Sequence, residues 1–115
     1  MSIEQTNTID FVDVNGETGD VWLTISDHLR WGDNDGRHLS MLQEKLNSYL
    51  RFVESGELLE RFPEARGRKV VFNVACKHPL NEIAQNFVRL ATPAVIQAGY
   101  SLQFKVLDDY QSALH

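Results

Sequence analysis

The chain has 115 residues and a formal net charge of −5, with 43% apolar and 23% charged residues. This balance is typical of one globular domain, excludes an intrinsically disordered chain, and disfavours nucleic acid as a partner because phosphate binding requires clustered Lys and Arg. A single cysteine, Cys76, rules out an intramolecular disulfide, and no apolar run is long enough for a signal peptide or a membrane span, so we expect a cytoplasmic protein without membrane contact.

The first predicted elements form a β-hairpin. Residues 1–7 are polar and aperiodic, so we expect a loose terminus before a first strand at 9–14. The Asn15-Gly16 pair follows, and residues 21–26 then alternate apolar and polar side chains. Because Asn and Gly tolerate positive φ, this pattern predicts a turn at Asn15-Gly16 between two antiparallel strands.

A polar loop over 27–36 leads into the first predicted helix, with Asp35 as its N-cap. Gly56 stands where a left-handed C-cap glycine belongs, and a further helical turn at 58–59 ends before Pro63. Apolar residues recur every three or four positions, which is typical of one helix face packed on a core. They are Leu39, Leu42, Leu46, Tyr49, Leu50 and Val53.

The C-terminal half alternates strand, helix and strand. Residues 69–76 and 102–106 are the predicted strands, since their side chains alternate or run apolar over a short length. The helix between them is expected to open at Pro79 and to stop at Gly99. Because proline removes a backbone donor and clashes with the preceding turn, we expect a break or kink at Pro93.

The order ββαβαβ predicts one α+β domain over residues 1–115, with a short tail at 108–115. Two helices with single apolar stripes can cover one face of a four-stranded mixed sheet, which gives a two-layer sandwich. Right-handed crossovers would make the second, third and fourth strands parallel. Their carboxyl ends would then share one edge of the sheet, where open α/β sheets bind ligands.

This edge gathers the reactive side chains of the sequence. The expected ligand-edge residues are Asp27, Trp31, Asp33 and Lys77. The candidate catalytic residues are His28, Cys76 and His78. The tail is expected to add Asp108, Asp109 and Tyr110. A small enzyme or metal site formed by 27–36 and 76–79 is therefore one hypothesis for function.

Structural interpretations compete with this chemistry. With Gly36 as the glycine of a calcium loop, the first and last ligands would be Trp31 and Leu42, which cannot coordinate calcium, and no metal or cofactor is expected. Cys76 and His78 point the same way in an extended strand, yet a buried, unreactive cysteine is the commoner outcome. Trp31 is either an anchor that pins its loop to the core or a platform for a ligand.

An apolar pair falls on the sheet face that the helices are expected to leave free. Trp22 and Val71 share that face, and an apolar patch among polar side chains often marks a protein contact. The alternative is that the N-terminal segment, or the C-terminal tail through Tyr110 and Leu114, covers the pair within the same chain. Trp22 and Val71 are thus the candidate interface residues.

A family pattern occupies the middle third of the chain. Trp31-Gly32 precedes the helical run Leu42-Gln43-Glu44-Lys45-Leu46-Asn47-Ser48-Tyr49-Leu50, which is followed by Gly56, Phe62-Pro63 and Gly67. This pattern resembles a family of small bacterial proteins whose function has not been assigned. The resemblance implies a bacterial source and a stand-alone domain, and it carries over no catalytic residue.

Three hypotheses for function follow. The leading one is a non-enzymatic binding or interaction module that self-associates as a homodimer through its free sheet face or an edge strand, so that its partner is a second copy or another protein. The second is the small enzyme or metal site at the loop edge. The third is an immunity-type protein that neutralises a basic partner through charge complementarity.

Overall fold

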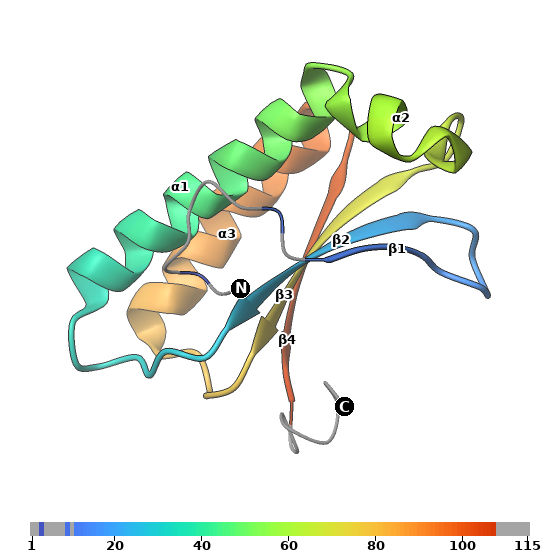
Figure 1. Cartoon of the computed structure of the whole chain (residues 1–115). Coiled ribbons are helices and arrows are strands. Elements are labelled where there is room, and N and C mark those ends of the chain that lie inside the picture. The colour runs from blue at the N-terminus through green and yellow to red at the C-terminus, as the bar shows by residue number, and fades with distance from the viewer. Residues whose placement is uncertain (1–2, 4–8, 10, 108–115) are drawn as a thin grey trace.

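The computed structural model describes residues 3, 9 and 11–107 of the chain (Figure 1). The elements, in the predicted order, are β1 (Phe11–Val14), β2 (Val21–Asp27), α1 (Asp35–Glu54), α2 (Glu57–Arg61), a 3₁₀ turn (Pro63–Ala65), β3 (Val70–Cys76), α3 (Glu82–Gln97) and β4 (Ser101–Val106). None of the helices in these ranges is long and apolar enough to cross a lipid bilayer. The tail at 108–115 and most of the predicted loose N-terminus lie outside the described residues.

The four strands form one mixed sheet in the order β1-β2-β3-β4. β1 runs antiparallel to β2, whereas β2, β3 and β4 run parallel to one another. Figure 1 shows α1 and α3 on the same side of this sheet. The predicted two-layer α+β sandwich is therefore confirmed, because each crossover helix returns over the same face.

The core lies between the sheet and the two long helices. Alternate residues of β2 and β3 face the helices and are fully buried, namely Val21, Leu23, Ile25, Phe72 and Val74. Aromatic rings join the layers, since the Phe72 ring lies 6.4 Å from that of Tyr49 in α1 and 5.5 Å from that of Tyr100 before β4. The Tyr49 hydroxyl also donates to the Thr24 carbonyl at 2.9 Å. Burial of this apolar surface is the main driving force for the fold.

The connection between β1 and β2 differs from the predicted Asn-Gly turn. The strands are joined by a longer loop over 15–20. Within it, the Asn15 side-chain oxygen accepts hydrogen bonds from two backbone N–H groups at 2.9 and 3.0 Å. The positive φ of 79° belongs to Gly19, and neither Asn15 nor Gly16 has one. By satisfying backbone donors of the loop, Asn15 favours this wider turn over a two-residue one.

Both long helices begin after an asparagine cap. Asn34 caps α1 by accepting from a helix N–H at 3.3 Å, so the predicted cap Asp35 is instead the first helical residue. Asn81 caps α3 in the same way at 2.9 Å, so this helix begins at Glu82 and not at Pro79. In each case the amide oxygen satisfies an N–H that has no partner within the helix.

The predicted helix break at Pro93 is wrong, because α3 continues through this residue, and the kink expected as its alternative stays a prediction. The bond that proline cannot make is the one to the Arg89 carbonyl, and Pro93 lies on the exposed side of the helix, where water can bind that carbonyl. Thr92 supplies a local bond by donating from its hydroxyl to the Val88 carbonyl at 2.7 Å. The helix stops as predicted at Gly99, whose φ is 100°.

Candidate functional site

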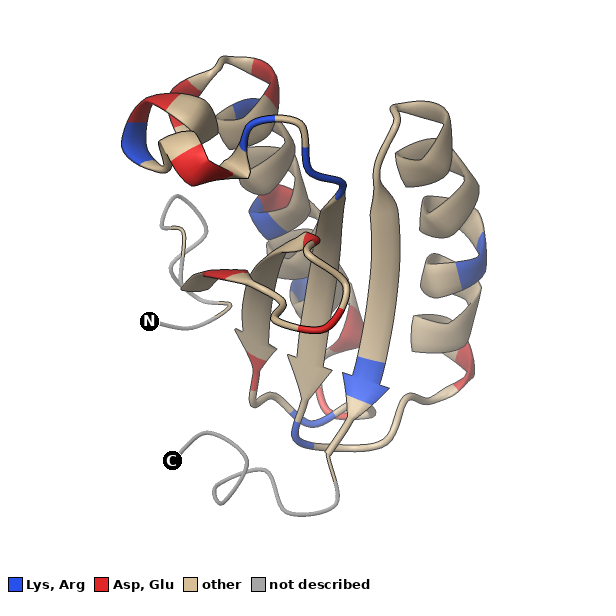
Figure 2. Ribbon diagram, turned by 90° about the vertical axis from the view of Figure 1, so that its right-hand side faces the viewer, with Lys and Arg blue, Asp and Glu red and all other residues tan. Residues whose placement is uncertain are grey.

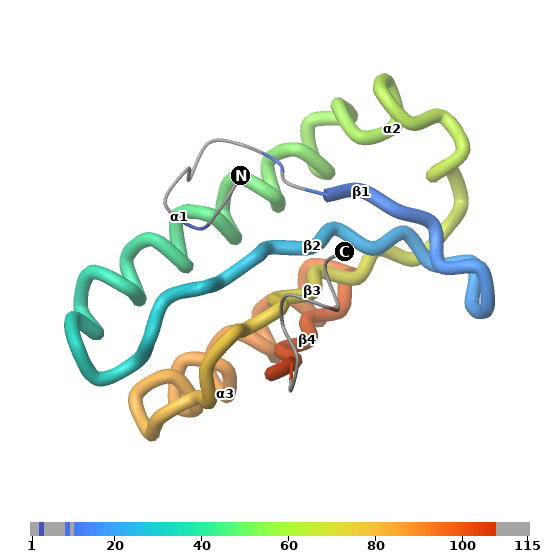
Figure 3. The backbone as a smooth tube through the Cα atoms, turned by 60° about the horizontal axis from the view of Figure 1, so that its bottom comes forward, coloured from blue at the N-terminus to red at the C-terminus, as the bar shows by residue number. Residues whose placement is uncertain are grey.

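Two loops meet at the carboxyl ends of the parallel strands. Asp27 and Cys76 end β2 and β3 and are register partners. The Lys77 N–H donates to the Asp27 carbonyl at 2.9 Å, and the Asn81 amide donates to the Asp35 carboxylate at 3.1 Å. The β2–α1 and β3–α3 connections therefore lie side by side, as Figure 3 shows at the end of the sheet where both strands leave for their helices.

A buried Asp–His pair joins the end of β2 to the first turn of α1. His38 Nε2 lies 2.9 and 2.7 Å from the two carboxylate oxygens of Asp27. Asp27 is 1% exposed and His38 is 2% exposed. Asp27 Oδ1 also accepts from the Leu29 N–H at 3.1 Å. Because a carboxylate only accepts hydrogen bonds, Nε2 carries a hydrogen and donates it to Asp27, and Nδ1 is the second polar atom of the ring.

Trp31 holds this imidazole in place. The two rings stack with their centroids 3.6 Å apart and their planes 17° from parallel. Trp31 is itself buried, and the loop turns directly after it at Gly32, whose φ of 105° is a value that glycine adopts without strain. The Asp35 carboxylate closes the turn by accepting from the Gly32 N–H at 2.7 Å. Trp31 therefore anchors its loop on the side chain of His38.

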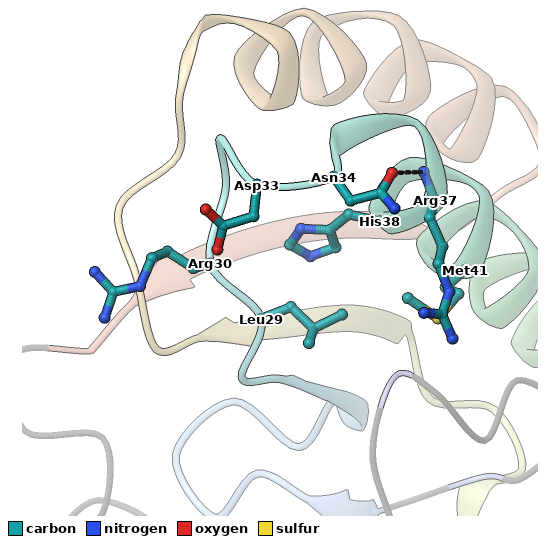
Figure 4. Close-up of a pocket in the computed structure, with 7 residues that line it drawn as sticks. All are labelled: Leu29, Arg30, Asp33, Asn34, Arg37, His38 and Met41. Atoms are coloured by element: carbon teal, nitrogen blue, oxygen red, sulfur yellow. Dashed lines mark hydrogen bonds between the residues drawn. The ribbon is translucent and has the colours of Figure 1, made fainter.

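His38 also lines a small cavity of about 150 Å³ between the β2–α1 loop and the first turns of α1. Figure 4 shows the residues that line it, which are Leu29, Arg30, Asp33, Asn34, Arg37, His38 and Met41. The Nδ1 atom of His38 is buried and has no hydrogen-bond partner in the described part of the chain. A buried polar atom without a partner, whether donor or acceptor, costs about 1–3 kcal/mol, so this nitrogen requires an explanation.

Cys76 is buried beside the Asp–His pair. Its thiol makes a weak hydrogen bond to the Val74 carbonyl at 3.7 Å. Burial and, to a smaller extent, the negative charge of Asp27 raise the pKa of the Cys76 thiol from 9.0 to about 12. Over the described residues, no hydrogen bond joins Cys76 to His78. This thiol is therefore protonated at neutral pH, which is unlike the low-pKa environment of reactive cysteines.

We expect Cys76 to resist alkylation in the folded protein. Near pH 8 a thiol with a pKa of about 12 forms about a thousandfold less thiolate than one with a pKa of 9.0, and the thiolate is the reactive form. Mass spectrometry should therefore show iodoacetamide labelling at least about a thousandfold slower in native than in urea-unfolded protein. The Cys76→Ser variant controls for labelling at other residues. Native and unfolded rates that agree within about tenfold would contradict the expected protection.

The same pKa shift makes stability depend on pH in one direction. The folded chain holds the thiol proton of Cys76 more tightly than the unfolded chain does. The contribution to stability is therefore fully present below pH 9 and is lost as the pH rises from 9.0 to about 12.

The other predicted site residues lie around this cluster. Asp33 lines the cavity, Lys77 is exposed, and His28 and His78 are half-buried. In the ranges that the structure describes, no three His, Cys, Asp or Glu side chains are grouped so as to hold a metal ion. The tail residues predicted to join this edge lie outside the described residues; they are Asp108, Asp109 and Tyr110.

The predicted interface pair lies on the sheet face away from the helices. Trp22 and Val71 are cross-strand partners in β2 and β3. Val71 is only 8% exposed, and Trp22 is half-buried. Tyr110 and Leu114, the residues expected to cover them, lie outside the described part of the chain. Val71 therefore offers little surface to a partner, whereas Trp22 keeps part of its side chain exposed, and the interface role of the pair stays a prediction.

The most exposed of the large apolar side chains in the described residues lie on α3. A cavity of about 280 Å³ lies between α1 and α3, and we call it the helix groove. Its lining residues are Gln43, Leu46, Asn47 and Leu50 of α1 with Phe87, Leu90, Ala91, Ala94 and Val95 of α3. Leu90 is 76% exposed, and Ile83, seven residues earlier on the same helix face, is 45% exposed.

His38 was not among the predicted site residues. The predicted apolar stripe of this helix begins at Leu39, but the buried side chains of α1 begin at His38 and continue through Leu42, Lys45 and Tyr49. These residues follow the three- and four-residue spacing of a helix face. A histidine and a lysine at core positions were the signal that could have revealed this polar cluster, because buried polar groups require partners.

The family comparison agrees with the resemblance seen in the sequence. The model of a family of unknown function, DUF6572, matches residues 1–108. No curated protein and no solved structure matches the chain. The match covers both candidate surfaces, the Asp27–His38 cavity and the helix groove. The chain belongs to DUF6572, a family of unknown function.

Proposed function

We propose that this protein is an interaction module that self-associates as a homodimer through its helix groove. The observation that carries the proposal is Leu90, a leucine that is 76% exposed beside an apolar groove on the same side of the molecule. Large apolar side chains next to an apolar groove are typical of protein contact sites. Leu90 outweighs the predicted Trp22–Val71 interface because Val71 is already buried within the single chain.

Charge favours a second copy as the occupant of the groove. The chain carries a net charge of −5, so two copies repel one another through most of their surface. The lining residues of the helix groove include no charged side chain. Between Glu82 and Val106 the only charged residues are Glu82, Arg89 and Lys105, and Figure 2 shows α3 almost free of charged positions. Two copies can therefore meet here without the repulsion that acts elsewhere.

The surface is also self-complementary. A two-fold contact requires that the same patch supply both the protruding side chain and the hollow that receives it. The exposed Leu90 and the groove lined by Leu50 and Phe87 lie side by side on the same face. Packing α3 against α3 of a second copy would bury Leu90 and Ile83 on both sides. The edge strand β4, next to α3 in the fold, is available to extend the contact.

Replacing Leu90 with aspartate is expected to dissociate the dimer. In light scattering over a dilution series, the unaltered protein should have a mass near twice the 13.1 kDa of one chain. Leu90→Asp should weaken dimerisation at least about tenfold, because a charge is placed in an apolar contact. Its circular dichroism should stay close to that of the parent, since Leu90 is mostly exposed in the single chain, whereas its unfolding midpoint should lose the dependence on protein concentration that dimerisation gives the parent.

Gln85→Asp is the matched control for charge. Gln85 is exposed on the same helix, about 140° around its axis from Leu90. The Gln85→Asp substitution therefore adds an equal charge outside the groove. The control should dimerise like the parent. A parent protein that is monomeric at all concentrations, or a Leu90→Asp variant that dimerises as tightly as Gln85→Asp, would disprove the proposal.

A further inference from the structure

We propose that two copies of the chain meet with their α3 helices antiparallel, so that Ile83 of each copy packs against Leu90 of the other. In the same arrangement Glu82 of each copy pairs with Arg89 of the other. This inference rests on the proposed self-association. It adds the orientation of the two copies and the charged residues that make the contact specific for a second copy of this chain.

The exposed apolar residues and the charged residues of α3 share one spacing. Ile83 and Leu90 are seven residues apart, and so are Glu82 and Arg89, which are both exposed and are the two charged residues of this helix. Seven residues make nearly two helical turns, so each pair forms a row along the helix, and the charged row lies about 100° around the axis from the apolar row. Phe87, which lines the helix groove, is on the opposite side of the apolar row. The charged row therefore flanks the contact and stays outside the groove.

Within one chain the two charges of α3 are too far apart to pair. Seven residues rise about 10.5 Å along a helix, which is well beyond the length of a salt bridge. Among the residues that the structure describes, neither Glu82 nor Arg89 forms an ion pair. The Arg89 guanidinium donates instead to the side-chain oxygen of Asn86, which lies one turn closer to Glu82. Both charges are thus available to groups of opposite charge on a second molecule.

An antiparallel contact matches both rows at once. A two-fold axis perpendicular to the helices reverses the chain direction and brings the same flank of each helix together. When Ile83 lies opposite Leu90 of the second copy, Glu82 is only about 3 Å along the helix axis from Arg89 of that copy, within reach of two long side chains. Symmetry makes each of these contacts twice. A parallel contact would put the two charged rows on opposite flanks, so that neither charge could meet its partner.

Charge exchange in the full chain tests the orientation. The Arg89→Glu homodimer would place glutamates opposite one another, and the Glu82→Arg homodimer would do the same with arginines. Each variant should therefore dimerise at least about tenfold more weakly than the parent in sedimentation equilibrium. An equimolar mixture of the two variants should form a heterodimer at least about tenfold tighter than either homodimer, because every contact then joins a glutamate to an arginine. The doubly exchanged chain, Glu82→Arg/Arg89→Glu, should dimerise within about threefold of the parent.

Glu60→Arg and Arg66→Glu form the matched control pair. Both residues are exposed and lie outside α3, and the two variants have the same net charges as the test pair. Net charge alone should make their heterodimer intermediate in strength between the two homodimers. If the exchanges at 82 and 89 behaved like this control while Leu90→Asp still dissociated the dimer, the antiparallel contact would be overturned and self-association would stand. A parent protein that stays monomeric at all concentrations would overturn both.

Discussion

Replacing His38 with leucine is expected to lower the free energy of unfolding by about 3–5 kcal/mol. The substitution removes the group that holds both carboxylate oxygens of Asp27. Among the residues that the structure describes, the buried carboxylate then keeps the Leu29 N–H as its one hydrogen-bond donor. An uncompensated charge in a site that is 1% exposed is far more costly than a lost surface contact. Urea unfolding followed by tryptophan fluorescence or circular dichroism measures the change.

A second substitution tests the cause of this loss. If the stranded carboxylate is responsible, adding Asp27→Ala to His38→Leu should recover at least about 1 kcal/mol, so the two changes should be strongly non-additive. Asp33→Ala serves as the control in the same loop, because Asp33 is exposed and should change stability by less than about 0.5 kcal/mol. Losses that simply add in the double variant would show that the Asp27–His38 bond is not the source of the effect.

Replacing Phe72 with alanine is expected to lower the free energy of unfolding by about 3–5 kcal/mol. Phe72 is completely buried at the centre of β3 and contacts the rings of Tyr49 and Tyr100. Its removal leaves a cavity where the sheet, α1 and the start of β4 meet. The rings of Tyr49 and Tyr100 are held by different elements, so they cannot easily move to fill this cavity. The midpoint of urea or thermal unfolding reports the loss.

Phe11→Ala is the matched control for this change. Phe11 lies on the edge strand β1 and is 41% exposed, so the same truncation should cost less than about 1.5 kcal/mol. If Phe72→Ala lowered the free energy of unfolding by no more than Phe11→Ala, the packing of Phe72 between the sheet and the helices would not be central to the core. Neither residue lines the cavity at His38 or the helix groove, so these variants test the fold alone.

The fold could be predicted because its elements have strong local signals. The alternation in β2 and β3 and the apolar spacing of α1 and α3 identify the elements, and the right-handed crossover rule then makes three strands parallel. The errors in helix ends and at Pro93 were local. Asn34 caps α1 in place of Asp35, and Asn81 caps α3, which therefore does not begin at Pro79, because each asparagine side chain bonds a free backbone N–H. α3 runs through Pro93 because the carbonyl that proline leaves unpaired is exposed to solvent. The apolar spacing of α3 also placed Ile83 and Leu90 on its buried face, and this is wrong because both are exposed.

The sequence alone determined the order of the elements, the layer architecture and the edge at which the two loops meet, because each depends on periodicity and chain direction. Only the tertiary structure decided which side chains at this edge are buried and which of them pair with one another. Asp27 and His38 are eleven residues apart in different elements, and nothing in their spacing indicates that the imidazole would be buried against the carboxylate and stacked on Trp31.

The helix groove likewise could not be predicted from the sequence. The apolar residues on α3 form a normal core stripe in the sequence, and only the packing of α3 against α1 and β4 leaves Leu90 exposed. Contacts between distant segments set burial, and burial determines whether a polar or apolar side chain is structural or available for binding.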